Sequence, residues 1–151
     1  MLKAVLRGAI AGAAGTTALN AVTYIDMAVR ARPPSDTPQQ AVAAIAERAG
    51  HPVPGHGAEQ ENRLGGLGPL AGIATGVGIG AAAGLLGPLI RRLPTLVGAS
   101  LLGAAAMAGS DLPLAKLGLT NPSRWSALDW TSDVVPHFAY GLVTYKALRH
   151  R

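Results

Sequence analysis

The feature that most constrains this chain is an apolar stretch, residues 65–90, that contains no charged residue. Its 26 residues exceed the number, about 20, that an α-helix needs to cross a hydrocarbon core roughly 30 Å thick. We therefore expect a transmembrane helix here, and the rest of the chain has to fold around it.

The overall composition fits the same environment. Only 14% of the residues are charged, against about 25% in soluble domains. Aromatic residues make up 4% of the chain, whereas it holds 20 glycines, so a water-soluble core would lack bulky filling. Small residues let helices approach closely in a bilayer. With 151 residues, the chain is expected to form one domain.

Residues 4–29 form a second candidate span. A basic start followed by apolar residues also describes a secretory signal peptide. Here the apolar character continues to Val29, and no small-x-small cleavage site follows. We therefore favour a retained transmembrane helix.

Residues 94–110 and 130–148 complete the set. The former is interrupted near its end by polar residues, whereas the latter is bounded by Trp130 and by Tyr145 and Lys146, which are typical interfacial anchors. The sequence thus predicts an all-α membrane protein, a bundle of four transmembrane helices.

The charges predict an orientation. The short connections and both ends carry only basic residues, seven in all, which are Lys3, Arg7, Arg91, Arg92, Lys146, Arg149 and Arg151. The two long connections carry charges of both signs. Because basic residues near helix ends in short loops stay inside, we expect a multi-pass protein of a bacterial inner membrane with both termini cytoplasmic. This flanking arrangement, rather than a basic face with aromatic platforms, excludes nucleic acid as a partner.

The first long connection contains a short amphipathic segment, residues 38–49. Thr37 and Gln40 are spaced as a capping box with Pro38 at the first helical position, and Gly50 is placed to end the helix. We expect an extracytoplasmic helix that lies on the membrane surface or packs over the bundle.

Glycine recurs at every fourth position through the second span. The row comprises Gly68, Gly72, Gly76, Gly80 and Gly84, and such a glycine zipper lets a neighbouring helix approach to van der Waals contact. Gly8 and Gly12 offer a matching surface on the first span. The row packs either within one chain, which we favour, or between copies in a homo-oligomer or a larger membrane complex.

Polar residues inside the spans are costly in a bilayer and mark candidate sites. In the first span Asn20 and Asp26 lie on the glycine-bearing side, and in the fourth Asp133, His137 and Tyr140 share one face at 100° per residue. In an up-down bundle, Arg63 and Asp111 lie at the same end as Asp26 and Asp133.

Three interpretations of this polar set remain open. It is structural if Arg63 neutralises Asp26 or Asp133 while Asp133 accepts a hydrogen bond from His137. It is a proton relay or cation site if the Asp–His pair exchanges ions. It is a metal site if His137 and Asp133 bind a divalent ion with a loop histidine. No cofactor can be named, there is no cysteine, and catalytic signatures are absent, so an enzyme is not expected.

Two segments carry a resemblance to a known family. Residues 7–20, RGAIAGAAGTTALN, and residues 129–141, DWTSDVVPHFAYG, resemble segments of small actinobacterial membrane proteins. The resemblance implies a helical inner-membrane protein and no assigned activity. The function expected first is therefore a structural or accessory protein that packs through glycine-rich helix faces. A small transporter or channel and a metal- or cofactor-binding membrane protein are the alternatives.

Overall fold

The computed structural model describes residues 1–150, and these residues form helices without strands. Four helices are long: α1 (Leu2–Arg30), α3 (Ala58–Leu85), α5 (Thr95–Lys116) and α6 (Ala127–Arg149). The shorter elements are α2 (Thr37–Arg48), α4 (Gly87–Ile90) and the 3₁₀ turn η1 (Pro122–Arg124). The all-α prediction is therefore confirmed.

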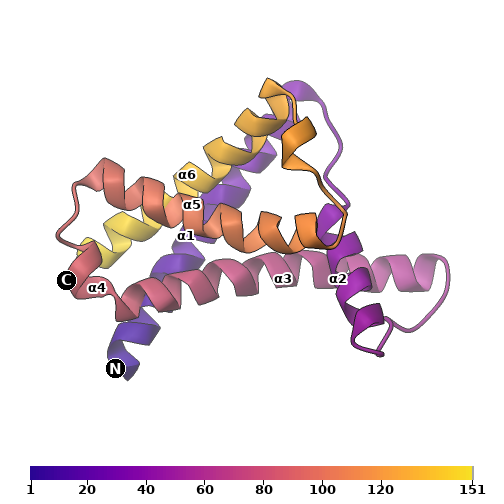
Figure 1. The fold of residues 1–151 in the computed structure, drawn as a ribbon, viewed down its shortest axis with the longest axis horizontal. Helices are drawn as coiled ribbons and strands as arrows, with labels where there is room; N and C mark the ends of the chain where they lie inside the picture. Colours follow the sequence, from indigo (N-terminus) through magenta and orange to yellow (C-terminus); the bar gives the residue numbers. More distant parts are fainter. Residues whose placement is uncertain (151) are drawn as a thin grey trace.

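The long helices pack as crossing pairs (Figure 1). α1 contacts both α3 and α6, while α5 contacts α6 and, less extensively, α3. Both termini and α4 lie at one end of the molecule, on the left in Figure 1, and α2 crosses α3 at the other end. We call the first the terminal end and the second the loop end.

Four helix boundaries differ from those expected. The second span ends at Leu85 rather than at residue 90, and Gly87–Ile90 form the separate helix α4. α3 begins at Ala58 rather than at residue 65, because its polar first turns, with Glu59 and Glu61, favour a helix N-terminus. α5 continues to Lys116, past the predicted end at residue 110. The Ser110 hydroxyl, which signalled an interruption, instead donates to the Ala106 and Met107 carbonyls of the preceding turn, at 3.3 and 2.9 Å.

α6 starts at Ala127, three residues before the predicted boundary, because a capping box precedes it. The Ser126 hydroxyl accepts from the Asp129 N–H at 3.2 Å, and the Asp129 carboxylate accepts from the Ser126 backbone N–H at 2.9 Å. Hydrogen bonds from the Ser126 hydroxyl and N–H lower the pKa of Asp129. The cap is therefore complete at neutral pH, with the carboxylate ionised.

The cap of α2 differs from the expected one. Asp36 is the N-cap residue, and the Gln40 amide donates to its carboxylate at 2.8 Å, so Gln40 does not form a box with Thr37. The prediction that Gly50 ends this helix is confirmed, since Gly50 follows α2 with φ +75°.

α1 and α3 meet backbone to backbone through glycine. A Cβ built on Gly12 would lie 2.9 Å from the Gly80 Cα, and one on Gly8 would lie 2.8 Å from the Gly84 Cα. Real Cβ atoms do not approach this closely, so any side chain here would force the helices apart. The close pairing of α1 with the C-terminal half of α3 depends on these glycines.

α5 and α6 meet through a second set of glycines that the sequence analysis did not single out. A Cβ on Gly103 would lie 2.7 Å from the His137 carbonyl oxygen, and one on Gly141 would lie 2.5 Å from the Gly103 nitrogen. Gly98 lies against the ring of Tyr145, whose hydroxyl donates to the Leu93 carbonyl. Two tight helix pairs are thus built by the same means.

Tyr140 joins the two pairs. Its side chain is fully buried, and its hydroxyl on α6 donates to the Gly76 carbonyl on α3 at 2.6 Å. The same ring lies against Gly15 of α1. Thr144, one turn further along α6, is also fully buried beside Gly15. Three helices therefore converge on one aromatic side chain.

Among the described residues, two helices, α3 and α5, are long and apolar enough to cross a membrane. α1 and α6 are comparably long, but both carry charged residues within them. The number of long helices thus agrees with the four predicted spans, but two of the four are apolar enough to cross a membrane by composition alone.

The glycine contact between α1 and α3 predicts a specific sensitivity. Gly80→Leu places a side chain where a Cβ alone would lie 2.5 Å from the Gly12 Cα. Overpacking of this kind should lower the free energy of unfolding by about 2 kcal/mol or more. Gly78→Leu is the matched control, because a Cβ at Gly78 meets nothing within 4 Å. Equal thermal unfolding of the two variants in detergent would contradict the assignment.

Candidate functional site

Four partly buried polar residues gather near the loop end, where α5 ends and α6 begins. Ser110 and Asp111 come from α5, and Asp133 and His137 come from α6. We call these four residues the acid–histidine cluster. Its position follows from the close contact of the two helices, because Gly103 allows the backbone of α5 to lie against that of α6 at His137.

His137 is held from both of its ring nitrogens. Nδ1 lies 2.8 Å from the Asp133 backbone carbonyl and 3.3 Å from Asp133 Oδ1. Nε2 lies 3.4 Å from the Ser110 hydroxyl on α5. The side chain of His137 is 13% exposed and that of Asp133 is 24% exposed. The expected i, i+4 pairing of Asp133 with His137 is therefore present.

Two carboxyl groups face one another beside this histidine. Asp111 lies close enough to Asp133 for the two carboxyls to interact, and its Oδ1 lies 3.2 Å from the Ser110 hydroxyl. Asp111 Oδ2 and Asp133 Oδ2 are buried and have no hydrogen-bond partner among residues 1–150. Buried polar atoms are almost always paired, so these two oxygens are the chemically available part of the cluster.

Asp26 belongs to a separate ion-pair network. Its carboxylate receives Arg30 at 2.5 Å and Arg32 at 2.7 Å. Arg30 also donates to the Ser132 hydroxyl of α6 at 2.7 Å. The network thus neutralises Asp26 and ties the end of α1 to the beginning of α6. A shallow cleft of about 160 Å³ lies beside it, between α1 and α6.

Arg63 does not serve the role expected of it. It pairs with Glu59 at 2.7 Å and donates to the Pro54 carbonyl at 2.7 Å, so it holds the loop before α3 rather than neutralising Asp26 or Asp133. Asn20 is partly buried on α1. Tyr140 is occupied by its hydrogen bond to Gly76 and has a packing role.

The glycine row divides into two parts. Gly76, Gly80 and Gly84 contact α1, and Gly68 contacts the backbone of α2 at Pro38 and Gln39. Gly72 is exposed, and a Cβ there would meet nothing within 4 Å. The row therefore packs largely within one chain, as favoured, and leaves a gap at its centre.

The metal interpretation required a loop histidine as a third ligand beside His137 and Asp133. Within the described part of the chain, no three His, Asp or Glu side chains converge as a metal site. His51 and His56, the loop histidines considered as partners, are exposed.

The sequence pattern placed Asp111 at this end of the bundle but did not single out two further participants, Ser110 and Arg30. Ser110 lies beside Asp111, and adjacent polar residues in an apolar helix are themselves a site signal. Arg30 follows Asp26 at i+4, which is the spacing of a helical ion pair.

The chain matches no protein-family model, and no curated protein or solved structure is significantly similar to it. The geometry described above is therefore the basis for a functional assignment.

Proposed function

We propose that the chain is a multi-pass protein of a bacterial inner membrane in which α1, α3, α5 and α6 all cross the bilayer. The apolar surface is the observation that carries this proposal. Only 22% of the most apolar window of α3 and 28% of that of α5 are buried, whereas the core helix of a soluble protein is mostly buried. In water these helices would expose large apolar faces.

α1 and α6 present similar surfaces, which supports their inclusion. Ile10 on α1 is 71% exposed and Val135 on α6 is 53% exposed. Further exposed apolar side chains on these two helices are Leu2, Leu6, Ile25, Val29, Leu128, Val134 and Phe138. The charges within α1 and α6 are compatible with spanning, because Asp26 is neutralised by arginines and Asp133 is turned toward His137.

Within that membrane, the function we favour is structural, namely assembly with another membrane helix. The open part of the glycine row supports this. Gly72, a member of the row, is exposed with no neighbour within 4 Å of a Cβ, and the same holds for Gly65 and Gly66, which precede the row on α3. α1 has diverged from α3 at this level, so a surface suited to close helix packing is left open to a second copy or to a partner.

A proton or cation site at the acid–histidine cluster is the second candidate. Its specific support is the pair of buried carboxylate oxygens, Asp111 Oδ2 and Asp133 Oδ2, beside the His137 ring. Two carboxyls held this close are most stable when they share one proton. Such a group, with a histidine to pass the proton on, has the composition of an intramembrane relay.

The membrane topology can be tested by single-cysteine labelling, because the native chain contains no cysteine. His51→Cys, in the loop before α3, should react with a membrane-impermeant maleimide in intact spheroplasts. Arg92→Cys, at the terminal end, should react only after permeabilisation. Both positions are exposed, so accessibility differs only through the membrane. Equal labelling of the two in intact cells would contradict the topology.

The assembly role predicts that Gly72→Leu reduces the mass of the complex in detergent or nanodiscs. A leucine there blocks close approach to the open part of the row but clashes with nothing inside the chain. Gly78→Leu, equally open on α3, is the control and should keep the assembly. The assembly role would be refuted if the wild-type protein, isolated from its native membrane under mild conditions, were a monomer with no other protein bound.

The relay predicts that Asp133→Asn combined with His137→Ala abolishes proton flux into proteoliposomes under an imposed potential. Glu61→Gln removes an exposed carboxylate of α3 outside the cluster and should leave the flux unchanged. Thermal unfolding establishes that each variant is folded. Wild-type vesicles that conduct no protons would make the cluster structural.

A further inference from the structure

A groove lies at the terminal end, away from the acid–histidine cluster. It has a volume of about 340 Å³ and is lined by Lys3, Leu6, Arg7, Ile10, Ala11 and Ala147. The first five belong to the opening turns of α1, and Ala147 belongs to the last turns of α6. We propose that this groove binds an anionic glycerophospholipid, with the phosphate between Lys3 and Arg7 and one acyl chain along Ile10 and Ala147. This inference rests on the membrane assignment above.

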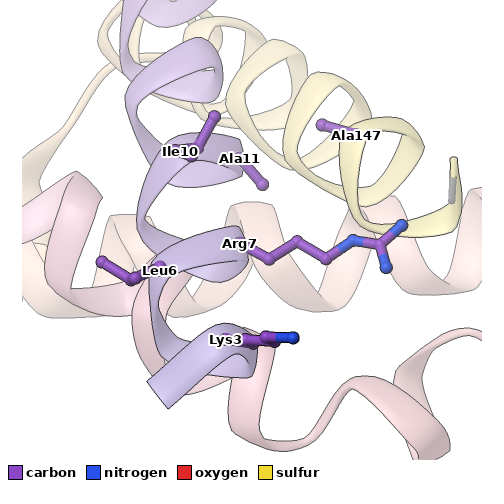
Figure 2. A pocket seen from close by; sticks show the side chains of 6 residues that line it. All are labelled: Lys3, Leu6, Arg7, Ile10, Ala11 and Ala147. Atoms are coloured by element: carbon purple, nitrogen blue, oxygen red, sulfur yellow. The ribbon is translucent and has the colours of Figure 1, made fainter.

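The two cations are placed to hold one anion. Lys3 and Arg7 are four residues apart and therefore lie on the same side of α1, one turn from each other. Figure 2 shows Arg7 extending from α1 toward the end of α6, with Lys3 one turn before it on α1. Neither side chain takes part in an ion pair within residues 1–150, where the paired cations are Arg30, Arg32, Arg63 and His137.

The distribution of charge at this end favours an anion from outside the chain. All eight acidic residues lie in α2, in the long connections or in the parts of the long helices near the loop end. Four more basic residues, Arg91, Arg92, Lys146 and Arg149, lie at the terminal end. Lipid phosphate is the anion available at a membrane surface, and basic pockets between helices on the cytoplasmic side bind it.

The remainder of the groove is apolar and faces the bilayer. Leu6 and Ile10 are 53% and 71% exposed. The floor is Ala11, which belongs to the buried core with Ala83 and Leu148. A free phosphate ion would use the cations and leave this apolar wall unused, which is why a lipid is the occupant.

The test is native mass spectrometry of delipidated protein in detergent, titrated separately with palmitoyl-oleoyl phosphatidylglycerol and the corresponding phosphatidylcholine. The wild type should prefer phosphatidylglycerol by about tenfold or more, since each interfacial cation contributes roughly 1 kcal/mol. The double variant Lys3→Gln with Arg7→Gln should lose this preference. Arg91→Gln with Arg92→Gln removes the same charge from the same end but outside the groove, and should keep it.

A third variant tests the apolar wall. Ala147→Phe fills the groove without changing a charge and should weaken phosphatidylglycerol binding. Displacement of the lipid by excess inorganic phosphate, together with full binding by Ala147→Phe, would overturn the lipid site in favour of a phosphate site. Equal loss in the two double variants would overturn it in favour of a general positive field.

Failure of this site and failure of the membrane assignment give different results. Absence of lipid preference in a wild-type protein that needs detergent to stay monodisperse overturns the lipid site alone. A protein that is monodisperse without detergent overturns the membrane assignment, and the lipid site with it. Thermal unfolding in lipid-free detergent should be equal for wild type and Lys3→Gln with Arg7→Gln, which confirms that the variant is folded.

Discussion

The contact on which the rest of the structure depends is the one between the backbones of α1 and α3. Gly8 and Gly12 lie against Gly80 and Gly84 without intervening side chains. In a bilayer, apolar side chains gain little by leaving lipid for a protein interface, so helices associate through close packing and hydrogen bonds. The chain meets this condition twice, at α1–α3 and at α5–α6. Tyr140 then joins the two pairs, because its hydroxyl on α6 bonds a carbonyl of α3.

This packing places residues of opposite charge at opposite ends of the molecule. The loop end holds acids, which are neutralised by arginines at Asp26 and left with unpaired oxygens at Asp111 and Asp133. The terminal end holds cations without acidic partners near Lys3 and Arg7. The molecule is therefore polarised along its length, and each end calls for a different partner. The proposed roles follow this division, with a proton or cation site at one end and an anionic headgroup at the other.

Much of the helical architecture could be predicted from the sequence, because long apolar runs and a four-residue glycine period are local signals. The end of α2 at Gly50 was predictable for the same reason. The pairing of Arg63 was predicted wrongly, since a nearer carboxylate at i−4, Glu59, was available to it. The α5–α6 contact was missed because Gly98, Gly103 and Gly141 form no regular period. The approach of Asp111 to Asp133 depends on that contact, so it was beyond reach of sequence reasoning alone.

A row with glycine at every fourth position presents a similar surface after every four residues, a rise of about 6 Å along the helix. By itself, such a row does not distinguish one alignment of α1 from another displaced by one repeat. The Tyr140 hydroxyl on the Gly76 carbonyl, and the Thr16 side chain against Gly76, mark one glycine as different from its neighbours. These two polar groups therefore fix the register of an otherwise repetitive interface. Without them, alignments of α1 on α3 that differ by one four-residue repeat would become nearly equal in energy. α1 could then shift between discrete registers along the glycine row.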